Sequence, residues 1–144
     1  MTQVAVPVAD LFTTGYSDAA AGTTSLYASL DEYPFSDADY VASASEPTDD
    51  PLVFRLTGLQ DPVTSSEHLL RYRIGKGTSA GIVSLDVELR QGYQHEGSQG
   101  LLIASWHHGD ISSDATTVSS ELTEAETDAI ENYADLFLRL RFTQ

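Results

Sequence analysis

The sequence predicts an all-β protein, a jelly-roll-like antiparallel β-sandwich of about eight or nine strands with one short helix near the C-terminus. Three observations predict it. Apolar and polar residues alternate with a period of two through most of the chain. Turn-forming segments separate these runs roughly every ten residues. One segment alone carries the start signals of a helix. We expect residues 1–144 to form one domain, since this length suits a single core.

Seven segments are predicted as strands. The clearest is 81–92, where four aliphatic residues between Val83 and Leu89 alternate with polar ones. The other six are 24–32, 51–58, 67–75, 100–108, 115–121 and 135–143. Two weaker strands are predicted at 4–9 and 39–45. Pro7 confines the first of these to the edge of a sheet, because proline cannot donate a ladder hydrogen bond.

The helix is predicted over residues 124–132. Thr123 is a favourable N-cap, and Glu126 three residues later completes a capping box. A short helix at this point lets the chain cross between the two sheets before the final strand. For Tyr133, at its exit, two interpretations remain open: a tyrosine corner whose hydroxyl bonds nearby backbone, or a simple core residue.

The charge of the chain excludes several classes of partner. Seven basic residues stand against 22 acidic ones, giving a formal net charge of −15. This field repels phosphate groups, so we expect no nucleic-acid partner and no binding to anionic membranes. No window is apolar enough for a membrane span, and cysteine is absent, which excludes disulfides and thiolate metal sites. We expect synthesis in the cytoplasm without processing.

The histidine pair of "SWHHGD" is the first candidate for chemistry. His107 and His108 lie close to Asp110, and a hairpin would bring His95 and Glu96 near them. Adjacent residues of a strand point to opposite faces, so one ion cannot bind both histidines without a turn. A strand running into a polar loop is therefore the favoured interpretation over a metal site.

The carboxylates offer two further candidates. Acidic loops around Asp37, Asp49 and Asp61 are oxygen-rich enough for a structural calcium, although ordinary turns in which aspartate bonds its own backbone explain them more simply. Asp86 and Glu88 share one face of a strand, as a glycosidase pair would require, but the pattern around them is typical of a solvated strand face. We therefore expect no enzyme, no catalytic residues, no cofactor and no metal.

A carbohydrate-binding module is the main alternative class. Such modules present exposed aromatic rings on a β-sandwich. Tyr33 and Phe35 in "DEYPFSD" are the best candidates for such a platform. The single tryptophan, Trp106, lies in an apolar run that is typical of a core.

Four segments, taken in order, carry a family resemblance: "LYASLDE" (26–32), "DADYVASA" (37–44), "LQDPVTSSEHLLRYR" (59–73) and "LTEAETDAIENYADLFLRLRF" (122–142). In this order they resemble small virion structural proteins of tailed bacteriophages and prophages. Leu30 stands where the family has isoleucine. The resemblance implies a structural protein of the particle: a head decoration (cement) protein or a small tail or fibre component. It implies no catalytic residues.

From this resemblance we expect a capsid decoration protein on the exterior of the virion. Its partner would be the major capsid protein, and it would bridge capsomers as a homo-oligomer, with a trimer as one arrangement. The expected contact is the apolar, nearly uncharged N-terminal segment, and its residues are Val4, Val6, Val8, Leu11 and Phe12. Two interpretations of residues 1–12 stay open: an extended arm that adds to a partner's sheet, or the first strand of this domain.

Overall fold

A computed structural model describes residues 2–32, 34–78 and 81–144. Within these residues the chain forms nine strands and one short α-helix, all strands pairing antiparallel. The predicted all-β sandwich is confirmed. The elements in chain order are β1 (Pro7–Phe12), β2 (Tyr16–Asp18), the 3-10 helix η1 (Leu26–Ser29), β3 (Val41–Ser43), β4 (Thr48–Leu56), β5 (Leu69–Ile74), β6 (Ser84–Gln91), β7 (Leu101–His108), β8 (Thr116–Glu121), α1 (Glu124–Asp128) and β9 (Leu136–Thr143).

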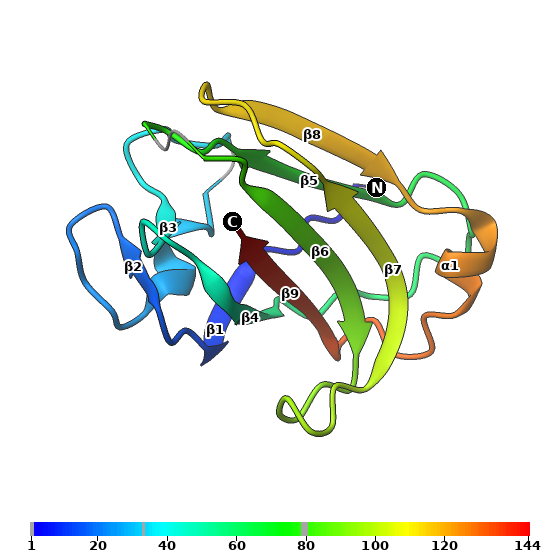
Figure 1. The fold of residues 1–144 in the computed structure, drawn as a ribbon. Helices are drawn as coiled ribbons and strands as arrows, with labels where there is room; N and C mark the ends of the chain where they lie inside the picture. The colour runs from blue at the N-terminus through cyan, green and yellow to red at the C-terminus, as the bar shows by residue number, and fades with distance from the viewer. Residues whose placement is uncertain (1, 33, 79–80) are drawn as a thin grey trace.

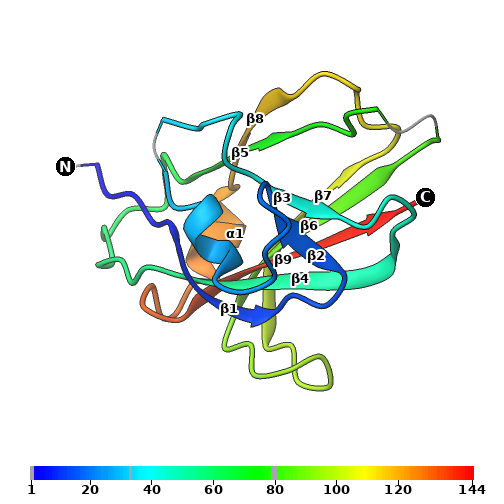
Figure 2. The ribbon, with the colours of Figure 1, turned by 90° about the vertical axis from the view of Figure 1, so that its left-hand side faces the viewer.

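The large sheet contains five strands in the order β1-β4-β9-β6-β7. The β5–β8 pair lies across one face of this sheet and forms the second layer (Figure 1). The small β2–β3 pair and η1 close one end of the sandwich, on the side that faces the viewer in Figure 2. We call the face of the large sheet that lies against β5–β8 the inner face, and the opposite face the outer face.

The strand pairing explains the jelly-roll character. β4 pairs with β9, β5 with β8, and β6 with β7, so three pairs nest inside one another along the chain. This is the arrangement of one long antiparallel hairpin that has been rolled up, and the extra pairing of β6 with β9 closes the roll. After β8, in the second layer, the chain must cross to the middle of the large sheet, where β9 lies. The segment that contains α1 makes this crossing.

The core fills the space between the layers. Leu85 and Val87 of β6 are fully buried, and Leu70, Tyr72 and Ile74 of the second layer pack against their cluster. At one end of the sandwich Tyr16 and Leu26 pack with β4, and at the other end the α1 region packs with β4, β6 and β7. The alternation predicted for residues 83–89 is confirmed, since all four aliphatic side chains are buried.

The predicted strand at 24–32 is wrong, because this segment contains η1. Ser25 takes a left-handed backbone conformation with φ of 57°, which breaks an extended run. The Asp10 carboxylate of β1 then accepts hydrogen bonds from the backbone N–H groups of Leu26 and Tyr27, both at 2.8 Å. Because Leu26 and Leu30 are four residues apart, they can lie on one side of a helical turn as well as on one side of a strand. Their spacing therefore did not distinguish the two.

The helix prediction is confirmed at its start and wrong at its end. Thr123 and Glu126 form the capping box, with Glu126 N–H donating to Thr123 Oγ1 at 3.2 Å and Thr123 N–H donating to Glu126 Oε2 at 2.8 Å. α1 ends at Asp128 rather than residue 132. The Gln91 side chain accepts from the N–H groups of Glu131 and Asn132, so these donors bond outside the helix.

Candidate functional site

The outer face of the large sheet carries a partly buried network of charges. Arg139 of β9 lies at its centre, and its side chain is only 7% exposed. Its guanidinium donates to Glu96 from Nε at 3.0 Å and from Nη2 at 2.8 Å, and to Glu88 of β6 from Nη1 at 3.3 Å. The β6–β7 loop, which contains Glu96, is thereby held against the sheet.

Two further side chains complete this network. Arg90 pairs with Glu88 at 2.6 Å, and the Tyr93 hydroxyl donates to Glu96 at 2.8 Å. The hydrogen bonds from Arg139 lower the pKa of Glu96, while burial and the neighbouring Glu96 raise the pKa of Tyr93 to about 12. Beside this network Val53, Tyr93 and Phe137 form a small apolar cluster, so both faces of the sheet contribute to stability.

A second row of charges crosses four strands. Arg141 of β9 lies 3.0 Å from Asp49 of β4 and 3.5 Å from Asp86 of β6, and Asp86 in turn lies 2.6 Å from His107 of β7. Hydrogen bonding to His107, followed by Arg141, lowers the pKa of Asp86. Asp86 and Glu88 were expected on a solvated face. Instead, Asp86 lies between Arg141 of β9 and His107 of β7, and Glu88 contacts Arg139 of β9 and Arg90 of its own strand.

The charge network predicts a specific acid sensitivity. Because the folded-state pKa of Glu96 lies below its ordinary value of 4.5, the unfolded chain binds more protons below that pH. The stability that Glu96 contributes is therefore complete above pH 4.5 and is lost as pH falls through the folded-state pKa. Denaturant titrations between pH 7 and pH 3 should show a flatter profile for Glu96→Gln than for the unmodified protein. Glu46→Gln, at an exposed loop position, serves as the control. Equal slopes for all three proteins would contradict the assignment.

The histidines do not gather in one place, and each contacts a different partner. His107 and His108 point to opposite faces as predicted: His107 pairs with Asp86 on the outer face, and His108 Nε2 bonds the Tyr72 hydroxyl of β5. His95 Nδ1 accepts from the Gly97 N–H within the β6–β7 loop. In the described part of the chain no group of three or more His, Asp or Glu side chains is arranged to hold a metal ion.

Tyr133 does not form a tyrosine corner, because its hydroxyl bonds a side chain. Its hydroxyl bonds His68 Nε2 at 3.0 Å, and its ring packs against the imidazole, with ring centroids 5.7 Å apart. Tyr16 does bond backbone, since its hydroxyl donates to the Asp50 carbonyl at 2.7 Å. β2, which begins at Tyr16, escaped the sequence patterns because it has only three residues.

The acidic loops contain aspartates that bond backbone. Asp61 accepts from the Val63 N–H at 2.7 Å, and Asp18 accepts from the N–H groups of Ala20 and Gly22. Asp61 thus forms the kind of turn that was predicted for the acidic loops, whereas Asp37 and Asp49 pair with Arg73 and Arg141.

The predicted contact residues of the N-terminal segment lie along one edge of the large sheet. Val4 precedes β1, and Val6 exchanges hydrogen bonds with Thr57. Val8 and Leu11 lie within β1 where its register against β4 shifts, and Phe12 packs beside the Val53 cluster on the outer face. Exposed fractions are 55% for Val4, 42% for Val8 and 38% for Leu11.

β1 is the last strand of its sheet, so one side of its backbone has no neighbouring strand among the described residues. The two register shifts act as β-bulges, which turn Val8 and Leu11 outward. Residues 2–6 run along the outside of the molecule into β1 (Figure 2). The segment therefore belongs to the domain and also presents apolar side chains at an open edge. Its contact with a partner stays a prediction.

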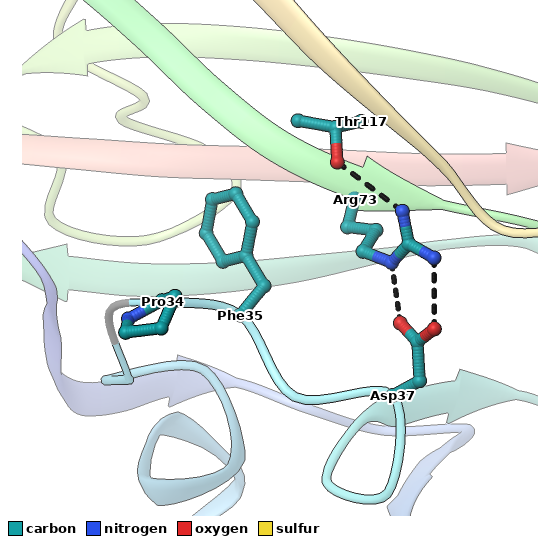
Figure 3. A pocket seen from close by; sticks show the side chains of 5 residues that line it. All are labelled: Pro34, Phe35, Asp37, Arg73 and Thr117. Carbon is teal, nitrogen blue, oxygen red and sulfur yellow. Dashed lines mark hydrogen bonds and ion pairs between the residues drawn. The ribbon is translucent and has the colours of Figure 1, made fainter.

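An open hollow of about 370 Å³ lies between the 34–37 segment and the β5–β8 pair. Pro34 and Phe35 line one side, and the Asp37–Arg73 pair lines the other, with Thr117 of β8 beside it (Figure 3). Arg73 donates to both carboxylate oxygens of Asp37 and, at 3.2 Å, to Thr117 Oγ1. Of the predicted aromatic platform, Phe35 lies in this hollow, while Tyr33 falls outside the described residues.

Comparisons with protein-family models, with curated proteins and with solved structures find no match for this chain. Over residues 2–32, 34–78 and 81–144, no helix is long and apolar enough to cross a membrane.

Proposed function

We propose that this protein is a structural component of a tailed-phage virion, namely a decoration protein that binds the outer surface of the capsid and bridges neighbouring capsomers. The observation that carries this proposal is the open edge strand β1. It presents Val4, Val8 and Leu11 to solvent in a chain of net charge −15. The resemblance of four ordered segments to small virion proteins supports the same assignment.

The chemistry of β1 suits attachment to another protein. An edge strand without a neighbour offers unpaired backbone groups to a partner strand, and exposed aliphatic side chains add apolar area to the contact. The bulges at Val8 and Leu11 limit uncontrolled pairing, which a protein present in many copies needs. The partner is the major capsid protein.

The rest of the molecule suits a rigid bridging subunit. The rolled hairpin pairs strands that are distant in sequence, and the outer face is tied down by ion pairs around Arg139. The acidic surface would face outward, away from packaged DNA, because like charges repel. Bridging several capsomers favours a homo-oligomer, with a trimer at local threefold positions as the proposed arrangement.

The contact is tested by the double variant Val8→Asp with Leu11→Asp. Two carboxylates at the edge would have to be desolvated on binding, so we expect the affinity for capsids to fall by about 100-fold. Co-sedimentation with undecorated capsids of the encoding phage, followed by quantitation of bound protein, measures this. Both side chains are exposed, so the melting temperature should change little.

A matched control places the same two charges elsewhere. Val63, which is 90% exposed, and Ile82 are both exposed outside β1, and Val63→Asp with Ile82→Asp should bind capsids like the unmodified protein. Equal binding by the β1 variant would contradict the proposed contact. Deleting residues 1–12 is a less clean experiment, because it removes an edge strand and the Asp10 carboxylate that caps η1.

A further inference from the structure

We infer that the hollow lined by Pro34, Phe35, Asp37, Arg73 and Thr117 is a binding site for a neutral saccharide. This inference goes beyond the capsid-binding proposal, because β1 forms no part of the hollow. Its volume of about 370 Å³ lies near the lower end of the range of small-molecule sites, which suits one sugar ring.

The shape of the lining matches the two chemical sides of a sugar. Pro34 and Phe35 present carbon-rich surfaces, and Phe35 is 36% exposed. Aromatic faces are suited to packing against the C–H side of a saccharide ring. The opposite wall is polar, because the carboxylate, the guanidinium and the Thr117 hydroxyl gather there (Figure 3).

The hydrogen-bonding groups on the polar wall are held in place. The bidentate contact aligns the Asp37 carboxylate with the Arg73 guanidinium, and Thr117 holds a further N–H of the same group. A carboxylate oxygen has more than one acceptor site, and a guanidinium has several donors. Acceptors and donors therefore lie side by side, as adjacent hydroxyls of a sugar require, since each hydroxyl both donates and accepts.

The charge of the site favours a neutral ligand. Asp37 and Arg73 cancel one another, and their mutual hydrogen bonds lower the pKa of Asp37 and raise that of Arg73, so both stay charged at neutral pH. An anionic ligand would have to displace Asp37 from Arg73 and approach a chain of net charge −15. A cation would have to displace Arg73 from Asp37.

The test uses a panel of neutral sugars: D-glucose, D-galactose, D-mannose and N-acetyl-D-glucosamine. Each is titrated into the full chain while amide and Arg73 Nε–H shifts are followed by heteronuclear NMR. We expect at least one sugar to saturate with a millimolar dissociation constant, as suits a shallow site for one ring. The shifts should cluster at Phe35, Asp37, Arg73 and Thr117.

Two variants locate the binding. Phe35→Ala removes the apolar wall and should weaken binding by about tenfold or more, and Thr117→Val, which keeps the shape of the side chain, should weaken it by a smaller factor. Asp110→Asn removes the negative charge of the Lys76–Asp110 pair, which lies outside the hollow, and should leave affinity unchanged. Retained spectral dispersion shows that each variant is folded.

Three results would overturn the inference. One is the absence of saturable shifts with every neutral sugar of the panel. Another is unchanged affinity in both Phe35→Ala and Thr117→Val. The third is saturable binding of N-acetylneuraminate, an acidic sugar, with a higher affinity than any neutral sugar of the panel. None of these results would affect the capsid proposal, since the β1 variants alter a different surface.

Discussion

Arg139→Ala is expected to lower the free energy of unfolding by about 3 kcal/mol and the melting temperature by about 10 °C. The substitution removes the guanidinium that pairs with both Glu96 and Glu88, so Glu96 loses this charge partner on a partly buried sheet face, whereas Glu88 keeps its contact with Arg90. Removing one partner of a buried ion pair costs about 3–5 kcal/mol. The lower end applies here because the Glu96 side chain keeps 32% exposure.

The matched control for this substitution is Arg73→Ala. Arg73 also makes a bidentate contact with a carboxylate, but this pair lies on the surface and solvent screens it. Urea denaturation of the two variants should therefore give a large loss for Arg139 and a small one for Arg73. A double-mutant cycle between Arg139→Ala and Glu96→Ala should reveal a coupling energy of about 1 kcal/mol or more. Similar losses for both arginines, with no coupling, would show that the network does not stabilise the sheet.

Phe54→Ala should destabilise the protein by about 3–5 kcal/mol. Phe54 is fully buried near the C-terminal end of β4 and packs with Tyr16, Leu26 and Leu52. Its ring joins the large sheet to the end that η1 and β2 close, so its loss leaves a cavity where three elements meet. Phe54→Leu, which refills part of that space, should cost much less.

Equilibrium denaturation measures this effect as a shift in midpoint at unchanged slope. Val63→Ala provides the control, because Val63 is 90% exposed and its truncation should change stability by less than about 0.5 kcal/mol. A shift for Phe54→Ala as small as that of Val63→Ala would mean that Phe54 does not lie in the core.

The strand alternation was sufficient to predict most of the fold. Segments such as 81–92 and 135–143 are long, strictly periodic and buried on one side, and they became β6 and β9. The helix start was predictable as well, because Thr123 and Glu126 act locally through the capping box. Which strands pair is decided by burial over the whole chain and not by a local pattern. The nested pairs β4–β9, β5–β8 and β6–β7 could therefore be identified only from the structure.

The failures share one physical cause, which is contact with distant residues. Segment 24–32 alternates like a strand, yet Asp10, far away in sequence, supplies acceptors that stabilise the η1 turn. Arg139 is buried, and Glu88 partly buried, where the β6–β7 loop brings Glu96 over the sheet to contact Arg139. Their alternation with apolar residues carries no signal for this, because a solvated face shows the same pattern.

The two candidate surfaces could also be predicted from the sequence only in part. The apolar N-terminal segment was visible in the sequence, whereas its position on an open sheet edge, with Val8 and Leu11 at bulges, came from the pairing of β1 with β4. Phe35 was recognised as a candidate ring. Its neighbours Arg73 and Thr117 were not, since they come from β5 and β8 and meet Asp37 only in the folded chain.

The central claim is that this chain decorates the outside of a capsid. The most direct measurement is a cryo-electron microscopy reconstruction of phage particles assembled with and without this protein. We predict added density on the outer shell at repeated positions between capsomers, with β1 against the capsid protein. Density confined to the tail or a fibre, or particles that lack the protein altogether, would contradict the claim.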